Sequence, residues 1–222
     1  MNRVDHSNMD IKIPQGFMVF ISGVPGVGKT TISYELLRTF SEFRIIEETD
    51  IIREILRGYN RHIEGVFGDK ASFIFDEIDI YDNTRFLTFA EAKKQCKHMK
   101  KSLEQVVIRQ QRKGIPSIIN GVHIVPEVLD GIAGNQNVIF INLFISNADA
   151  IYNRLKSREP DKYNPSIVPT VFQTNANLRT STLNVAERSP NIFNNIDVTN
   201  LNKEETLCEV VRCIGRLIES KN

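Results

Sequence analysis

A glycine-rich segment at residues 23–30 carries the clearest chemistry in the sequence. It reads Gly-Val-Pro-Gly-Val-Gly-Lys-Thr and matches the phosphate-loop pattern at all of its fixed positions. Glycines let consecutive backbone N–H groups converge on one anion, while Lys29 reaches the β- and γ-phosphates and Thr30 ligates magnesium. The segment therefore predicts binding of ATP with Mg²⁺ by Gly23, Val24, Pro25, Gly26, Val27, Gly28, Lys29, Thr30 and Thr31.

Polar residues follow two of the expected strands, and they could act on the hydroxyl compound that receives a phosphoryl group, called the acceptor below. Asp50 comes at the end of the strand expected at residues 44–49, on the sheet edge where ligands of α/β sheets bind. Its carboxylate could take the proton of an acceptor hydroxyl or hold magnesium. Arg53, three residues later, could clamp an anionic acceptor. His123 follows the third strand and could bind an acceptor oxygen, or be satisfied by nearby backbone.

Arginines in the second half of the chain could stabilise a transferring phosphoryl group. Arg154 and Arg158 lie four residues apart, at the end of an expected helix, and lead into a proline-bounded loop. Such a pair can close over the phosphoryl group and offset its developing charge. Arg179, in a polar helix, is a weaker candidate for binding the substrate. We therefore interpret Lys29, Asp50, Arg154 and Arg158 as the catalytic set.

The elements that must position these residues alternate between strands and helices. Short apolar runs predict strands at residues 17–21, 44–49, 116–119, 138–145 and 191–194. Helices are expected after the phosphate loop, and at residues 51–58, 84–113, 148–158, 170–187 and 207–217. This alternation predicts an α/β fold in three layers, with a five-stranded parallel sheet covered by helices on both faces.

The length of 222 residues fits one domain. We interpret residues 1–15 as a lead-in and residues 16–222 as a single kinase domain. Within it, residues 59–83 form an acceptor-binding insertion, after a helix that Gly58 ends, and residues 154–166 form a small lid.

Composition and charge indicate the cellular location and the kinds of binding partner to expect. The net charge of +1 argues against a nucleic-acid partner. No apolar run is long enough to span a membrane, and the N-terminus lacks the apolar core of a signal peptide. The three cysteines, Cys96, Cys208 and Cys213, have no metal-binding spacing and are expected to be buried reduced thiols. The expected setting is cytoplasmic, and the oligomeric state is open, with a homodimer as one option.

The motifs together resemble the archaeal-type 2-phosphoglycerate kinases. The resemblance rests on residues 21–31, 49–57 and 121–126, with further similarity at residues 95–109 and 191–197. It implies an ATP- and Mg²⁺-dependent small-molecule kinase with a fold like that of the nucleoside monophosphate kinases. It also implies Asp50 as the base, Arg53 and His123 near the acceptor, Arg154 and Arg158 as lid arginines, and Asn195 and Asp197 near the adenine.

One position departs from that family. An acidic residue precedes Gly-Val-His there, whereas this chain has Asn120, which cannot supply a negative charge to magnesium. Either Asp50 or Glu48 covers that role, or the metal site is weaker, or the acceptor differs.

The leading hypothesis is phosphoryl transfer from ATP to a hydroxyl of a small anionic molecule. Among kinases, the alternatives are a nucleoside or nucleotide kinase, a sugar-nucleotide kinase and a polynucleotide kinase. From other classes, the alternatives are a regulatory ATPase without a small acceptor, and a degenerate kinase that only binds ATP.

Overall fold

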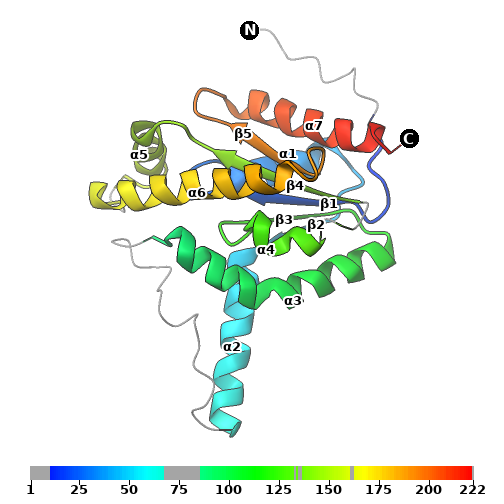
Figure 1. Ribbon diagram of the computed structural model, residues 1–222, viewed down its shortest axis with the longest axis horizontal. Helices are drawn as coiled ribbons and strands as arrows, with labels where there is room; N and C mark the ends of the chain where they lie inside the picture. The colour runs from blue at the N-terminus through cyan, green and yellow to red at the C-terminus, as the bar shows by residue number, and fades with distance from the viewer. Residues whose placement is uncertain (1–10, 68–85, 133, 135–136, 161–162, 222) are drawn as a thin grey trace.

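The computed structural model describes residues 11–67, 86–132, 134, 137–160 and 163–221 of the chain. Its centre is a sheet of five parallel strands in the order β2-β3-β1-β4-β5 (Figure 1). The strands are β1 (Met18–Ser22), β2 (Ile45–Glu48), β3 (Ser117–Gly121), β4 (Val138–Phe144) and β5 (Phe193–Asp197). The predicted five-stranded parallel sheet is confirmed. Because β1 is the middle strand, the phosphate loop lies at the centre of the carboxyl edge of the sheet.

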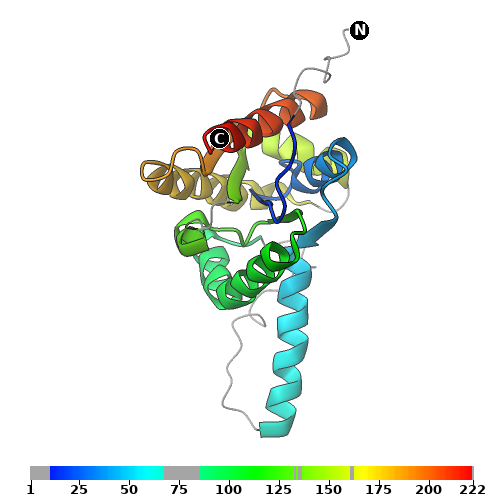
Figure 2. The same cartoon turned by 90° about the vertical axis from the view of Figure 1, so that its right-hand side faces the viewer.

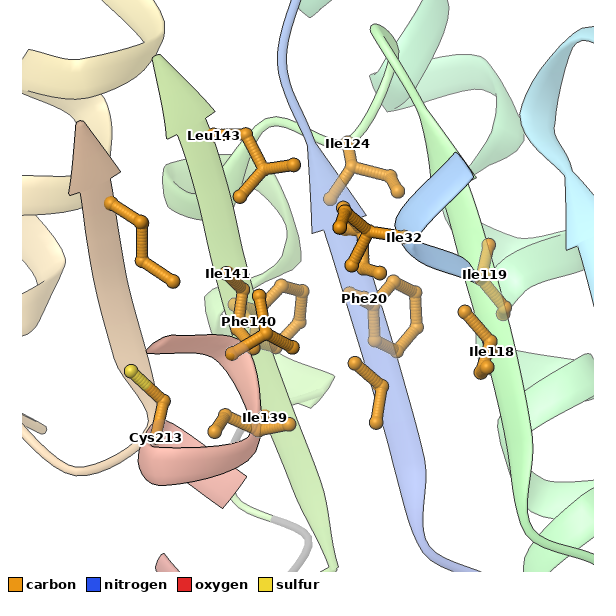
Figure 3. Close-up of a cluster of buried hydrophobic side chains, with 14 of the residues drawn as sticks. Phe20, Ile32, Ile118, Ile119, Ile124, Ile139, Phe140, Ile141, Leu143 and Cys213 are labelled. Atoms are coloured by element: carbon orange, nitrogen blue, oxygen red, sulfur yellow. The ribbon is translucent and has the colours of Figure 1, made fainter. Parts of the chain in front are cut away.

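Apolar residues fill both faces of the sheet. Every residue of β1, β3 and β4 is buried, as expected for parallel strands covered by helices. The rings of Phe20, Phe140 and Phe193 stack across three neighbouring strands, with centroids 4.6 and 4.8 Å apart. Figure 3 shows Phe20 and Phe140 among the aliphatic side chains of this cluster. This packing holds the strand that carries the phosphate loop.

Helices cover the two faces of the sheet (Figures 1 and 2). On one face α1 packs against α7, and on the other α3, α4 and α6 contact one another, while α5 lies against α6. The predicted three-layer arrangement is confirmed. The bounds are α1 (Lys29–Thr39), α3 (Phe89–Lys113), α4 (Pro126–Leu129), α5 (Ala148–Arg158), α6 (Val168–Ala186) and α7 (Lys203–Glu219), with short 3-10 helices at Asp130–Ile132 and Pro165–Ile167.

Helix α2 (Thr49–Phe67) extends away from the layered body of the molecule (Figure 2). The expectation that Gly58 ends this helix is wrong, because the helix continues through it. A glycine inside a helix costs only about 1 kcal/mol relative to alanine, which neighbouring helix-forming residues can offset. The predicted insertion at residues 59–83 is therefore helical up to Phe67, and residues 68–83 lie outside the described residues.

Several other boundaries differ from the sequence-based expectations. The helix expected from residue 84 begins at Phe89, because Thr88 and Glu91 form a capping box there, and residues 84–85 lie outside the described part. The fifth strand is Phe193–Asp197 rather than residues 191–194. Helix α4 was not predicted. Of the lead-in predicted at residues 1–15, residues 11–15 are not loose, since Ile13 is buried in the core, and residues 1–10 lie outside the described residues.

Other sequence-based expectations concern membranes and thiols. None of the described helices has the length and apolar character needed to cross a membrane. The three cysteines carry free thiols, of which those of Cys96 and Cys213 are buried and that of Cys208 is half-buried.

The end of β3 packs against the start of α2 at Gly121. This residue has φ 156°, and a Cβ placed on it would lie 1.7 Å from Oγ1 of Thr49. Glycine therefore permits the close approach of these two elements. The approach matters for the site because Asp50 and His123 follow the two contacting residues in the chain.

We expect Gly121→Ala to lower the free energy of unfolding by about 1–3 kcal/mol or more, because the added methyl group overlaps the Thr49 hydroxyl. Gly58→Ala is the matched control, since a Cβ at that helical position meets nothing within 4 Å. It should leave stability unchanged or raise it by up to about 1 kcal/mol. Urea unfolding of the two variants measures the difference. Equal stabilities would contradict the close contact at Gly121.

Candidate active site

The phosphate loop joins the end of β1 to the start of α1. Gly23, Gly26 and Gly28 have φ values of 143°, 88° and 97°, which L side chains rarely adopt. A Cβ on Gly23 would also lie 2.5 Å from the carbonyl oxygen of Leu143 on β4. Because α1 begins at Lys29, the N-terminal end of its dipole faces the loop. This arrangement suits an anion, and phosphates above all.

Lys29 folds back over its own loop. Its Nζ donates a hydrogen bond to the carbonyl oxygen of Val24 at 3.0 Å. Burial lowers the pKa of Lys29 to about 8, against the opposing influence of the Asp50 and Glu48 carboxylates and with a further lowering by Arg158. The ammonium group is therefore poorly compensated within the protein, and a bound polyphosphate would stabilise its charged form.

A cleft of about 570 Å³ opens beside the phosphate loop. The loop and the first turn of α1 form one wall, β2 contributes Glu48, and α5 contributes two arginines. The structure thus brings together phosphate-loop residues and the two arginines that the sequence predicted to close over the phosphoryl group. The lining residues are Pro25, Gly26, Gly28, Lys29, Thr30, Thr31, Glu48, Arg154 and Arg158.

Asp50 and His123 meet where α2 begins and β3 ends. Oδ1 of Asp50 lies 3.6 Å from Nδ1 of His123, and the same ring nitrogen lies within hydrogen-bond distance, 3.0 Å, of Oγ1 of Thr49. The Asp50 side chain is half exposed, whereas the His123 ring is fully buried. The carboxylate can therefore meet a ligand, while the ring is fixed by its neighbours. Thr49 was missed by the sequence reasoning, which treated it as part of the strand.

Arg53 is a fully buried arginine on the first turns of α2. Its Nε and Nη2 donate to Oε1 of Glu54 at 3.2 and 2.9 Å. Its Nη1 has no hydrogen-bond partner among the described residues, and the same holds for Nε2 of His123. Buried polar atoms of this kind are rare in native proteins and indicate a missing partner. Both atoms belong to residues that the sequence placed near the acceptor.

His123 is held in its neutral form by its surroundings. Burial lowers the pKa of His123 to about 4; Asp50 opposes this shift, whereas Arg53 and Lys29 add to it. The imidazole therefore carries one N–H donor and one acceptor nitrogen at neutral pH. These influences also place the phosphate-loop lysine and the Asp50–Arg53–His123 cluster within electrostatic reach of one another.

The two arginines of α5 differ in how firmly they are held. Arg154 donates through Nη2 to the carbonyl oxygens of Val198, Thr199 and Leu201, so it ties α5 to the segment after β5. Arg158 has a side chain that is 66% exposed, and its Nε lies 3.6 Å from Oε1 of Glu159. Arg158 is therefore free to reorient toward a ligand, whereas Arg154 would first have to leave its carbonyl partners.

A row of polar side chains crosses the carboxyl ends of β1, β4 and β5. The Ser22 hydroxyl donates to Oδ1 of Asn142 at 2.8 Å, and Nδ2 of Asn142 donates to Oδ1 of Asn195 at 2.7 Å. Asn195 thus belongs to this row, which the sequence reasoning did not foresee. Asp197, two residues on, accepts hydrogen bonds from the backbone N–H and the hydroxyl of Thr199.

Arg179 lies on the β4–β5 side of the sheet. Its guanidinium stacks over the Phe144 ring, 4.7 Å from the centroid, and its backbone oxygen accepts a hydrogen bond from Asn195. The Asp50–Arg53–His123 cluster instead lies by β2 and β3. The role of Arg179 in binding the substrate stays a prediction, and the residue lies on the opposite side of the sheet from that cluster.

Asn120 faces the helix that follows the phosphate loop. Its Nδ2 donates to Oγ of Ser33 at 3.2 Å, and that hydroxyl donates to the carbonyl oxygen of Lys29 at 2.9 Å. Asn120 is buried, and it pairs in register with Glu48 of β2. The asparagine therefore fixes the first turns of α1 from the neighbouring strand.

Comparisons with known proteins agree with this arrangement. No family model matches the chain. It is 28% identical over 144 residues to the mevalonate-3-phosphate 5-kinase of Thermoplasma acidophilum, a match that covers 64% of this chain and 67% of that protein. It is 29% identical over 115 residues to the 2-phosphoglycerate kinase of Thermococcus kodakarensis, covering 49% of this chain but only 37% of that protein.

A solved structure extends the likeness to nearly the whole chain. The gluconokinase of Sinorhizobium meliloti 1021 superposes with a TM-score of 0.59 over 95% of this chain and 97% of its own, at 14% identity. At that identity the likeness shows the fold alone. The chain thus has the fold of the P-loop kinases, and its predicted resemblance to archaeal small-molecule kinases is confirmed.

Proposed function

We propose that this protein is a kinase that transfers the γ-phosphoryl group of ATP to a hydroxyl group of a small anionic molecule. One observation carries the proposal. A phosphate loop lies on the same edge of the sheet as an accessible carboxylate, Asp50, that is flanked by a buried arginine and a buried histidine with unpartnered polar atoms. Both relatives are kinases whose names specify a phosphorylated acceptor, which supports an anionic acceptor here.

In this proposal the phosphate loop and the start of α1 hold the triphosphate. Lys29 exchanges the Val24 carbonyl for the β- and γ-phosphates, which stabilise its charged form. The Thr30 hydroxyl would hold Mg²⁺, which would supply positive charge against the negative charge that develops during transfer. Asn195 and Asp197 lie at the carboxyl end of β5, where we place the adenine.

The acceptor side of the cleft would be formed by the first turn of α2 and the end of β3. Arg53, whose unpartnered Nη1 is buried in the free protein, would bind the anionic group of the acceptor once binding opens a path to that atom. The neutral His123 ring orients the acceptor through Nε2, and Asp50 takes the proton from the attacking hydroxyl. Arg158, and Arg154 after leaving its carbonyl partners, would offset charge on the transferring group. The same arginines belong to the lid proposed at residues 154–166, of which residues 161–162 lie outside the described residues.

We expect Asp50→Asn to lower kcat for acceptor phosphorylation by about 10²–10⁴-fold, because the amide cannot accept the hydroxyl proton. Nucleotide affinity should change only slightly. Asp149→Asn, which removes an exposed carboxylate from the first turn of α5, is the matched control and should keep wild-type turnover. Acceptor-stimulated release of ADP measures both variants. Wild-type turnover by Asp50→Asn would show that Asp50 is not the base.

We expect Arg53→Lys to raise KM for an anionic acceptor by about 10–100-fold, because a lysine cannot reproduce the fork of the guanidinium. KM for ATP should stay near the wild-type value. Arg57→Lys is the control. Arg57 also contacts Glu54 from the same helix, but its side chain is 14% exposed, whereas that of Arg53 is fully buried. Steady-state kinetics with both substrates varied separates the two effects. Equal changes in acceptor KM for the two variants would contradict a specific role for Arg53.

Nucleotide affinity should weaken as the pH rises above about 8, the pKa of Lys29 in the free protein. The charged lysine binds the triphosphate, and deprotonation therefore competes with binding, so Kd should rise about tenfold between pH 7 and pH 9. In Lys29→Arg the side chain does not titrate in this range, and the dependence should vanish. Calorimetric titration with ATP tests this expectation. The same pH dependence in both proteins would contradict it.

A further inference from the structure

Magnesium in P-loop enzymes is commonly held by the hydroxyl of the loop and a carboxylate from a neighbouring strand. The strand beside β1 on the acceptor side is β3, which ends in Asn120 and Gly121. The Asn120 amide is neutral, and it donates to Ser33 Oγ at 3.2 Å. The position that would supply the charge is therefore occupied by a residue that holds α1 in place.

Glu48 lies on β2, one strand further from β1 than Asn120, and its side chain points to the same face of the sheet as that of Asn120. Glu48 and Asn120 are partners in the parallel ladder, and paired residues of a parallel ladder point to the same face of the sheet. The bond from Asn120 to Ser33 identifies that face as the one covered by α1. Glu48 accordingly lines the cleft together with Lys29 and Thr30.

The carboxylates of Glu47 and Asp50, which are near Glu48 in the sequence, lie elsewhere in the structure. Glu47 points to the opposite face, where its Oε1 accepts a hydrogen bond from Nε2 of Gln110 on α3 at 3.4 Å. Asp50 lies 3.6 Å from the His123 ring, on the acceptor side. Among the described residues that line the cleft, Glu48 is the one carboxylate.

We propose that Glu48 supplies, from β2, the negative charge that orders Mg²⁺ and its water shell at the phosphate loop. This inference rests on the proposed function. The longer side chain of glutamate covers part of the roughly 4.8 Å spacing between neighbouring strands. Glu48 is thus a positioning residue for the metal, while Asp50 is left free to act on the acceptor.

The donor set fits magnesium. This ion keeps several waters and is usually bound by one or two protein oxygens together with substrate phosphates. Thr30 and Glu48 provide such a pair in the cleft.

The test measures ATP binding, by calorimetry, as a function of Mg²⁺ concentration and without turnover. In Glu48→Gln we expect the Mg²⁺ concentration for half-maximal binding to rise by about 10–100-fold, the usual effect of losing a partner of the metal shell. Binding of metal-free ATP should be unchanged or tighter, because a negative charge near the phosphates is removed. Glu47→Gln, the adjacent residue on the opposite face, should match the wild type.

Asn120→Asp in the Glu48→Gln background should lower the Mg²⁺ requirement again, because it returns a carboxylate to the end of β3. If this double variant does not fold, Glu48→Asp replaces it and should show an intermediate Mg²⁺ requirement. An unchanged Mg²⁺ requirement in Glu48→Gln would overturn the inference and leave the proposed kinase activity standing. Failure of the wild-type protein to bind ATP at any Mg²⁺ concentration would instead overturn the proposed function.

Discussion

The convergence of backbone N–H groups at the end of β1 is the constraint on which the rest of the site depends. It requires the positive φ angles of Gly23, Gly26 and Gly28, and it directs the start of α1 toward the loop, an arrangement that suits an anion. The loop can hold this geometry because β1 is buried at every residue between β3 and β4. The parallel sheet then directs the ends of the neighbouring strands to the same edge, so Asp50 and His123, which follow β2 and β3, lie on the edge that carries the loop.

Burial of polar groups gives that edge its electrostatic character. Arg53 and His123 are fully enclosed, yet each keeps a polar atom without a partner among the described residues. Such groups cost stability unless a ligand satisfies them, so they favour a ligand with complementary charge and hydrogen bonds. Asp50, in contrast, is half exposed and keeps its carboxylate accessible. Arg53 and His123 are enclosed and can orient a ligand, whereas Asp50 is exposed and can accept a proton. We expect this division of roles in a phosphoryl-transfer site.

The phosphate loop, the parallel sheet and the cluster of Asp50, Arg53 and His123 could be predicted from sequence, because each depends on local spacing or on strand ends. Contacts between distant segments could not. Two examples are the hydrogen bonds from Arg154 to the segment after β5 and those that link the polar side chains from Ser22 to Asn195. Both depend on the order of the strands, which local patterns do not encode. Gly58 misled the helix prediction, because a single glycine is a weak signal when the flanking residues favour a helix.

Transfer of label from ATP labelled at the γ-phosphate tests the central claim most directly. The acceptors should be matched pairs that share a hydroxyl group and differ in one anionic group, such as glycerate with and without a 2-phosphate. We predict that the label appears in a phosphorylated organic product and that the more anionic member of a pair is preferred. Release of all label as inorganic phosphate, at one rate with and without any acceptor, would contradict the account.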